Sequence, residues 1–452
     1  MASQSLISTV NGYENYIKDK GKDEQVINAY VDACSVAING EKDIEYGLQL
    51  TKRAKELIED FCTAKTGGTI WDLDYYHFKH ETTPYDLVNH YFDLFLMEAH
   101  YKFESFMIYM EKNRPPWERF YLPRRNPLSK VAQLIQDLYD DKLDEGMVFC
   151  PGRIGKTQIV KMGNLWFGSN RPERSNLYSA YSDKITGGFY DGTLEMVNDP
   201  TYTYKDIYPK IVEKKAITDG KDLTIDFLRK KTYPTFTMRS IYGTLNGACD
   251  CDGLGVYDDL FSGIDEALSE DRQATVWGKF DNNFMPRIKP GKAKLLGIGT
   301  RWAPKDVQGR RLELLANNPE YKNIRHREVI IPALNENNES NFDYPYKLGY
   351  STLDYKRRMA SFEDNDDMAS WFAQYQQEPI ERKGQMFNID NMNFFDPAEI
   401  EGIRPDRIFS ANDPAYGGGD FVSMPICYEI EKEYYIVDVV YNDGDKDITN
   451  PE

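Results

Sequence analysis

Four side chains in two places along the chain have the types that phosphate chemistry needs. Lys156 and Thr157 follow Gly155 directly, and Asp258 and Asp259 stand together further along. A lysine ammonium neutralises phosphate charge and a threonine hydroxyl can bind Mg²⁺. Of two adjacent carboxylates, one can hold the metal while the other orients a water molecule. We predict that Thr157 and Asp258 bind Mg²⁺ and that Lys156 and Asp259 are catalytic.

The residues around Lys156 predict a strand, a loop and a helix in that order. An apolar run ends at Phe149, Pro151-Gly152 breaks it, and helical spacing starts after Gly155. Backbone N–H groups at such a helix start point toward a phosphate. The usual pattern has a glycine where Cys150 stands, and a chance tripeptide on a surface turn is the alternative. The predicted phosphate-binding loop, in which Arg153 adds a further catalytic charge, comprises Pro151, Gly152, Arg153, Ile154, Gly155, Lys156 and Thr157.

Two other short apolar runs end in polar residues. Leu254 to Tyr257 precedes the aspartate pair, for which a surface turn is the alternative. Leu295 to Gly299 precedes Thr300-Arg301-Trp302, where Thr300 and Arg301 are predicted to sense the γ-phosphate; a plain strand cap is the alternative. Strands are also predicted from Asn176, over 224–228 and over 235–242, with a helix over 183–197. Strands that alternate with helices predict an α/β fold with a doubly wound, mainly parallel sheet.

Residues 1–112 form the first predicted region and have helical spacing throughout. Ile44 to Ala64 is amphipathic, and Pro84 to Lys112 is predicted as one long aromatic helix that either packs in the core or faces a partner. Arg114 to Leu128 is rich in prolines and arginines and is predicted to break the helix. It has two interpretations, an adenine-binding face or an exposed linker. A helix over 129–143 then leads into the loop strand, inside a nucleotide-binding domain over 113–380.

The C-terminal part begins with polar and acidic residues at 335–370, which predict a solvated excursion. A linker over 381–406 precedes a last domain at 407–452. There a strand leads to Asp413 and a glycine-rich turn ending at Asp420, and two further strands follow, the second containing Asp438. An aspartate after a first strand and then a hairpin is how an RNase H-like nuclease begins, and such a site holds two metals roughly 4 Å apart. Asp413 is the predicted metal ligand.

Composition limits the classes of protein that fit. The chain has 452 residues, which suits two or three domains, and 41% hydrophobic residues indicate a folded protein. No apolar run is long enough for a bilayer and no signal peptide is visible, so no membrane partner is expected. Six scattered cysteines indicate free thiols. The net charge of -18 opposes tight nucleic-acid binding, but a motor that touches DNA briefly needs only a local basic patch.

The chain resembles the large terminase subunit of tailed double-stranded DNA bacteriophages, from about Arg119 onward. The resemblance depends on segments in the family's order: Cys150-Pro-Gly-Arg-Ile-Gly-Lys-Thr, like its deviant Walker A loop; Gly253-Leu-Gly-Val-Tyr-Asp-Asp, like its Walker B region; Gly299-Thr-Arg-Trp, like its coupling segment; Gln374-Tyr-Gln-Gln-Glu-Pro at the domain junction; and Asp413-Pro-Ala-Tyr-Gly-Gly-Gly-Asp420, like its first nuclease motif.

The resemblance implies an ATPase that packages viral DNA. It implies a P-loop NTPase domain with an additional strand, ATP and Mg²⁺ as cofactors, and an RNase H-like nuclease that uses Mg²⁺ or Mn²⁺. Its implied partners are double-stranded DNA, the procapsid portal protein, a small terminase subunit and copies of itself in a pentameric ring, in the host cell cytoplasm.

The chain departs from the family in three places. Asp259 replaces the usual glutamate, and no arginine finger stands out, with Arg171, Arg174 and Arg301 as candidates. The later nuclease acids are absent, so the chain as given is expected not to cut DNA. The sequence does not distinguish a shortened chain from a naturally split gene. Two other functions also fit: a helicase-like nucleic-acid-dependent ATPase, and an assembly component with a vestigial nucleotide site.

Overall fold

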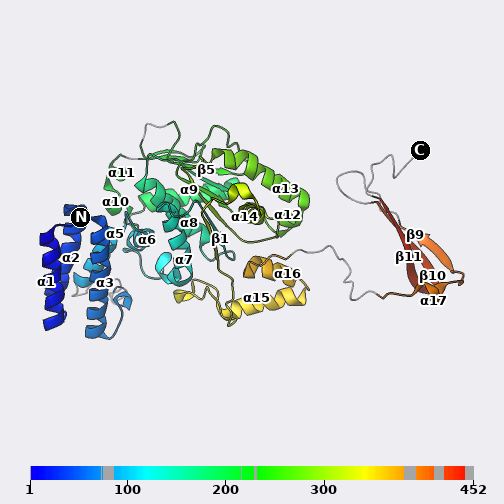
Figure 1. Cartoon of the computed structure of the whole chain (residues 1–452), viewed down its shortest axis with the longest axis horizontal. Coiled ribbons are helices and arrows are strands. Elements are labelled where there is room, and N and C mark those ends of the chain that lie inside the picture. Colours follow the sequence, from blue (N-terminus) through cyan, green and yellow to red (C-terminus); the bar gives the residue numbers. More distant parts are fainter. Residues whose placement is uncertain are drawn as a thin grey trace. The chain divides into compact units, whose positions relative to one another are not determined.

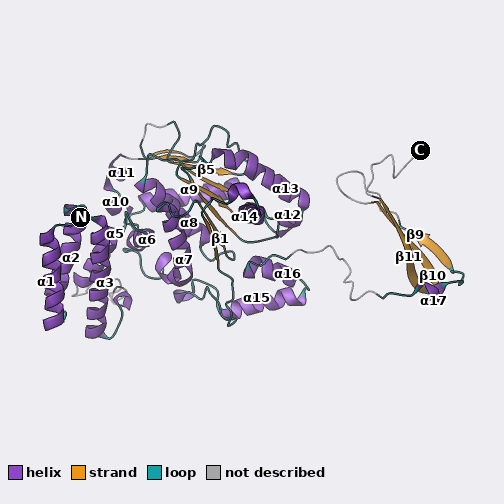
Figure 2. Cartoon of the chain, in the orientation of Figure 1, coloured by secondary structure: helices purple, strands orange, loops and turns teal. Residues whose placement is uncertain are grey.

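The computed structural model describes residues 2–72, 74, 86–214, 216–228, 232–380, 393–411 and 422–442. The chain divides into two compact units, Met1–Glu381 and Arg382–Glu452. Figure 1 traces the chain, and Figure 2 shows strands surrounded by helices in the first unit. The finer domain division at residues 112 and 406 stays a prediction.

The N-terminal residues of the first unit are helical. Side chains of Ser3, Asp23 and Asp43 cap three of these helices by accepting backbone N–H groups. The helices are α1 (Gln4–Lys20), α2 (Glu24–Ser35), η1 (Val36–Gly40), α3 (Ile44–Thr66), α5 (Asp86–Glu98) and α6 (Phe103–Met110).

The single long helix predicted up to Lys112 is wrong, because the chain turns between α5 and α6. The buried Glu98 carboxylate explains the turn, since it accepts hydrogen bonds from Lys102 and Ser105 beyond the turn as well as from α3. The predicted core role of the aromatic stripe is confirmed for Tyr91 and Phe95, which are buried.

An eight-stranded sheet lies at the centre of the first unit, in the order β3-β4-β5-β2-β6-β7-β1-β8. The pairs from β5 to β8 are parallel, and β3 and β4 add antiparallel pairs at one edge. The strands are β1 (Glu145–Phe149), β2 (Asn176–Ala180), β3 (Ile217–Asp219), β4 (Thr224–Asp226), β5 (Phe236–Ser240), β6 (Leu254–Asp258), β7 (Lys294–Gly299) and β8 (His326–Ile330). The predicted α/β fold with a mainly parallel sheet is confirmed.

Helices cover both faces of this sheet, so its central strands are buried along their whole length. On β1, Val148 belongs to the main core with α7, α8 and α9, while Met147 and Phe149 pack on the other face against Leu315 of α14. The first face is covered by α7 (Tyr121–Tyr139), α8 (Lys156–Asn170) and α9 (Asp183–Asn198). Elements of the second face and its surroundings are α12 (Ile264–Leu268), α13 (Glu270–Lys279), η2 (Phe280–Phe284), η3 (Met285–Arg287), α14 (Val307–Asn317) and η4 (Pro319–Tyr321); α10 (Tyr204–Ile207) and α11 (Pro209–Lys214) follow α9.

Two predicted loop regions are instead helical. The helix predicted to start at 129 begins at Tyr121, because the Glu111 carboxylate accepts the backbone N–H groups of Phe120 and Tyr121 and caps it. The solvated excursion at 335–370 contains α15 (Thr352–Asp364), started by a capping box of Ser351 and Asp354. It also contains η5 (Pro345–Lys347) and α16 (Met368–Trp371), and η6 (Phe372–Gln376) follows.

The second unit contains α17 (Pro397–Ile400) and an antiparallel three-stranded sheet. The strands β9 (Arg407–Ser410), β10 (Val422–Ile430) and β11 (Glu433–Asn442) are in the order β11-β10-β9. The three predicted strands therefore form. Asp413 and Asp420 lie outside the described residues, so the nuclease assignment stays a prediction. Asp438 lies on β11 opposite Ile426.

Candidate nucleotide site

The predicted phosphate-binding loop connects β1 to α8 at the carboxyl end of the sheet. Gly155 has a φ of 105°, and Arg153 has a φ of 65°, which is rare for a residue with a side chain. A Cβ on Gly155 would lie 2.5 Å from the Phe120 ring, so both its conformation and its contact require glycine. Lys156 is the first residue of α8. The loop thus leads into a helix N-terminus, as the sequence predicts.

The Lys156 ammonium points to the ends of two other strands. It lies 2.9 Å from Asp259 Oδ2 and donates to Thr300 Oγ1 at 2.6 Å. Its side chain is buried. Burial lowers the pKa of Lys156, but the Asp259 carboxylate and its neighbours outweigh burial and raise it. The lysine is therefore held in its charged form beside the loop.

Asp258 is the last residue of β6, the strand next to β7. Its Oδ2 accepts hydrogen bonds from the Thr157 hydroxyl and from the Tyr178 hydroxyl, both at 2.9 Å. Its Oδ1 is buried and has no hydrogen-bond partner among the described residues. Burial, and then the neighbouring Asp259 charge, raise the pKa of Asp258 to about 7.

This unsatisfied oxygen fits a bound metal. A buried acceptor without a partner costs free energy, and a cation is the natural partner for a carboxylate oxygen beside a threonine hydroxyl. Thr157 and Asp258 would hold Mg²⁺. The metal-binding role of both residues stays a prediction.

Asp259 differs from Asp258 in exposure and backbone conformation. Its side chain is 27% exposed, whereas Asp258 is almost completely buried. Its φ is 39°, so the chain turns sharply after β6. Asp259 Oδ1 accepts the Thr300 backbone N–H at 2.8 Å. The acid predicted to orient water is thus bonded at both carboxylate oxygens, to Lys156 and to Thr300, and stays partly exposed.

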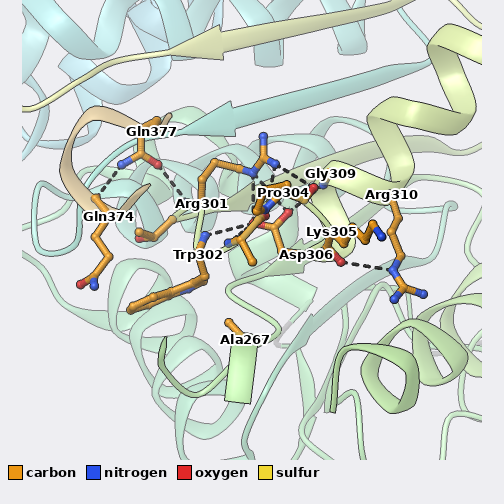
Figure 3. A network of polar contacts seen from close by, with 12 residues as sticks. Ala267, Arg301, Trp302, Pro304, Lys305, Asp306, Gly309, Arg310, Gln374 and Gln377 are labelled. Atoms are coloured by element: carbon orange, nitrogen blue, oxygen red, sulfur yellow. Dashed lines mark hydrogen bonds and ion pairs between the residues drawn. The ribbon is translucent and has the colours of Figure 1, made fainter. Parts of the chain in front are cut away.

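The predicted sensing residues follow β7, which lies between β1 and β6. Thr300 contacts both Lys156 and Asp259. The Arg301 guanidinium instead pairs with the buried Asp306, with Nε 3.0 Å from Oδ2 (Figure 3). It also stacks over the Phe149 ring. Arg301 is therefore bonded within its own chain, and its candidate role as an arginine finger stays a prediction.

The two other candidate arginines lie at the opposite end of the sheet, just before β2. Arg171 stacks on the Tyr139 ring and donates to the Tyr139 carbonyl. Arg174 donates to the Asp252 carbonyl. Neither contacts the loop of its own chain. Arg153 is exposed on the loop itself.

The residue that departs from the usual loop pattern, Cys150, is completely buried. Burial raises the pKa of its thiol to about 12. Its carbonyl accepts a hydrogen bond from the Thr300 hydroxyl. The side chain therefore packs as a small apolar group, and the polar contact to Thr300 comes from the backbone carbonyl.

Sequence reasoning did not predict the site contacts of four residues. Tyr178 reaches Asp258 from β2, which only the strand order reveals. Phe120 and Arg124, in the segment with two interpretations, lie against the loop, and Arg124 stacks between Phe120 and Tyr344. The exposed-linker interpretation is therefore wrong. Gln377 accepts the Arg301 backbone N–H.

The strand β7 lies between β1, which leads into the loop, and β6, which ends at the aspartate pair. This strand order and the loop together define an α/β fold of the P-loop NTPase type. No protein-family model and no curated protein matches the chain. Among solved structures, the chain is similar to the crystal structure of the HK97 bacteriophage large terminase, with a TM-score of 0.38 and 15% identity, over 69% of this chain and 61% of that chain. The chain thus covers less than two thirds of that terminase. At this level of similarity, a functional assignment depends on the residues of the site.

Within the described residues, no helix is both long and apolar enough to cross a membrane.

Proposed function

We propose that this chain is an ATPase of the large-terminase type, which uses ATP hydrolysis to move double-stranded DNA into a viral procapsid. The observation that carries the proposal is the convergence of separate motifs at one end of the sheet. Lys156 and Thr157 contact Asp259, Asp258 and Thr300, three residues at the ends of two other strands. The junction residue Gln377 bonds to the next residue, Arg301. A chance Gly-Lys-Thr tripeptide would not gather these partners.

The residues have distinct roles in this proposal. The loop N–H groups, Lys156 and Arg153 bind the phosphates of ATP. Thr157 and Asp258 hold Mg²⁺, which when bound neutralises charge on the phosphate oxygens. The ATP phosphates draw Lys156 away from Asp259, which leaves that carboxylate free to accept a hydrogen bond from the attacking water. Positioned charges of this kind supply most of phosphoryl-transfer catalysis.

The start of α7 provides a place for the nucleobase. Tyr344 donates to the Ile154 carbonyl of the loop, and it lines a cavity of about 1040 Å³ together with Arg119, Pro123 and Asn126. Stacked aromatic and guanidinium groups suit a planar base. The proposal therefore assigns the adenine to this side of the loop.

The proposed partners follow from the motif resemblance. They are double-stranded DNA, the portal protein of the procapsid, a small terminase subunit and further copies of this chain in a pentameric ring. The proposed place of action is the host cell cytoplasm, at the portal vertex.

ATP hydrolysis by the purified chain, with and without linear double-stranded DNA, tests the proposal. We expect DNA to raise turnover and Asp259→Asn to abolish it, because an amide cannot take up the proton of the attacking water. Asp438→Asn, in the second unit, is the matched control and should keep turnover. Unwinding of duplex DNA without a procapsid would favour a helicase instead. Absence of ATP binding would favour an assembly component.

A further inference from the structure

The segment that leads out of the first unit is hydrogen-bonded to the ends of both strands that flank β1. Gln377 Oε1 accepts the Arg301 backbone N–H at 3.0 Å, just after β7 (Figure 3). Gln376 bonds to both backbone groups of Leu334, beyond β8, and the Tyr375 carbonyl accepts the Ala333 N–H. This segment, Phe372–Glu378, therefore contacts the chain on either side of the phosphate-loop strand.

Gln377 is buried, and its side chain is hydrogen-bonded at both ends of the amide. It is 4% exposed, and its φ of 64° is in the left-handed region that disfavours side chains. Its Nε2 donates to the Gln374 carbonyl at 2.6 Å, so both ends of the amide are bonded. A strained residue persists only where its surroundings fix it, which is typical of functional positions.

The Arg301 N–H that Gln377 accepts follows directly after Thr300, which contacts the predicted catalytic residues Lys156 and Asp259. The Thr300 N–H donates to Asp259, and the Thr300 hydroxyl accepts from Lys156. Since the Thr300–Arg301 peptide group carries the N–H that Gln377 accepts, the amide fixes the orientation of that peptide. The Arg301 side chain is fixed separately by Asp306, which also accepts the N–H groups of Trp302 and Gly309.

We propose that Gln377 is a positioning residue that ties the orientation of Asp259, through the Thr300–Arg301 peptide, to the segment Phe372–Glu378. The inference rests on the proposed ATPase function and names where the state of the nucleotide is passed on. When Lys156 turns from Asp259 and Thr300 to a phosphate, the peptide loses one constraint, and Gln377 moves with it. The receiving segment ends close to Glu381, the last residue of the first compact unit.

Kinetics of Gln377→Met, which keeps the volume and removes both hydrogen bonds, give the first test. We expect kcat for ATP to fall about tenfold while KM changes less than about twofold, because orientation of the water is lost and ATP binding is kept. Gln374→Met is the control, since the Gln374 side chain points away from the network and only its carbonyl takes part (Figure 3). Equal kcat in the two variants would overturn the proposal.

Gln377→Gly separates positioning from folding. Glycine adopts the left-handed conformation without strain, which offsets part of the stability lost with the two hydrogen bonds, so this variant should stay folded at the assay temperature, keep the wild-type KM and still lose kcat. A variant that is unfolded at that temperature, or whose KM rises in step with the fall in kcat, would mean that Gln377 is merely structural.

Hydrogen exchange with and without Mg²⁺ and ATPγS distinguishes this inference from the proposed function. We expect nucleotide to protect residues 151–157 and also to change exchange in 372–378, with only the second response lost in Gln377→Met. Protection of the loop without any response at 372–378 would overturn the role of Gln377 alone. No protection of the loop would overturn the proposed function and this inference with it.

Discussion

Charged side chains gather at both ends of the central sheet, but they are bonded in different ways. At the amino end, Lys294 and Arg325 each bond to both Asp141 and Asp144. At the carboxyl end, Asp258 keeps one buried oxygen without a partner among the described residues. The four charged groups at the amino end are thus paired with one another, whereas Asp258 keeps an unpaired oxygen among the described residues.

The titration of the aspartates follows this difference. Hydrogen bonds from Arg325 lead the causes that hold the pKa of Asp144 well below its usual range, whereas burial raises the pKa of Asp258. A saturated cluster stabilises the fold, and an unsatisfied buried carboxylate costs free energy that a ligand can recover. We therefore propose the carboxyl end of the sheet as the functional end.

The largest expected effect is on turnover in Lys156→Ala. We expect kcat for ATP to fall about a thousandfold, because the charge that neutralises the phosphates is lost. The matched control is Lys294→Ala, a buried lysine paired with two aspartates at the other end of the sheet, which should keep wild-type turnover. Similar losses in the two variants, measured by steady-state hydrolysis, would erase the distinction between the two ends.

Stability should depend on the amino end instead. Arg311 forms a buried pair with Glu145, the first residue of β1, with Nη2 2.8 Å from Oε2. Arg311→Met leaves the Glu145 charge unpaired and should cost about 3 kcal/mol in denaturant unfolding. The double variant Arg311→Met, Glu145→Met should recover most of this loss. A single variant as stable as wild type would contradict the structural role of that end.

Metal binding at Asp258 should depend on pH, unlike the ion pairs at the amino end. The folded pKa of Asp258, about 7, exceeds its ordinary value of 3.8. In the window between these two pH values, native Asp258 keeps a proton that the unfolded chain loses. Its contribution to stability therefore falls as pH rises through the window, and Mg²⁺ must displace the proton below pH 7. We expect Mg²⁺-dependent ATPγS binding to tighten up to about tenfold from pH 6 to pH 7 and to level off above. Asp258→Asn should lack this dependence.

The smallest effect is expected for Tyr178→Phe, which removes the hydroxyl that bonds to Asp258 and keeps the ring stacked on Phe189. Loss of that donor raises the pKa of Asp258 further, so the Mg²⁺ concentration for half-maximal turnover at pH 7 should rise about threefold. The shift should shrink at pH 8.5. An equal shift at both pH values would mean that Tyr178 acts by shape alone.

The sequence predicts those parts of this fold whose pattern is local. Neighbouring residues predict the strand, loop and helix around Lys156, and also the strands that end at Asp258 and just before Thr300. The helix α7 is predicted, but its start at Tyr121 is not, because its cap, Glu111, comes from outside the segment and outweighs the prolines.

The site contacts that were missed depend on strand order. Tyr178 reaches Asp258 only because β2 lies beside β6, and Gln377 reaches Arg301 across a long separation in the chain. Neither relation leaves a periodic signal. By contrast, the capping box of α15, Ser351 and Asp354, is a local pattern in the sequence. The acidic residues around it favour the interpretation as a solvated excursion.

Binding of ATPγS, measured by calorimetry with Mg²⁺ and with a chelator, tests the nucleotide site most directly. We expect one binding site per chain in the presence of Mg²⁺, much weaker binding with the chelator, and no binding to Lys156→Ala. Binding that is unchanged in Lys156→Ala, or absent from the wild-type chain, would contradict a nucleotide site at the carboxyl end of the sheet.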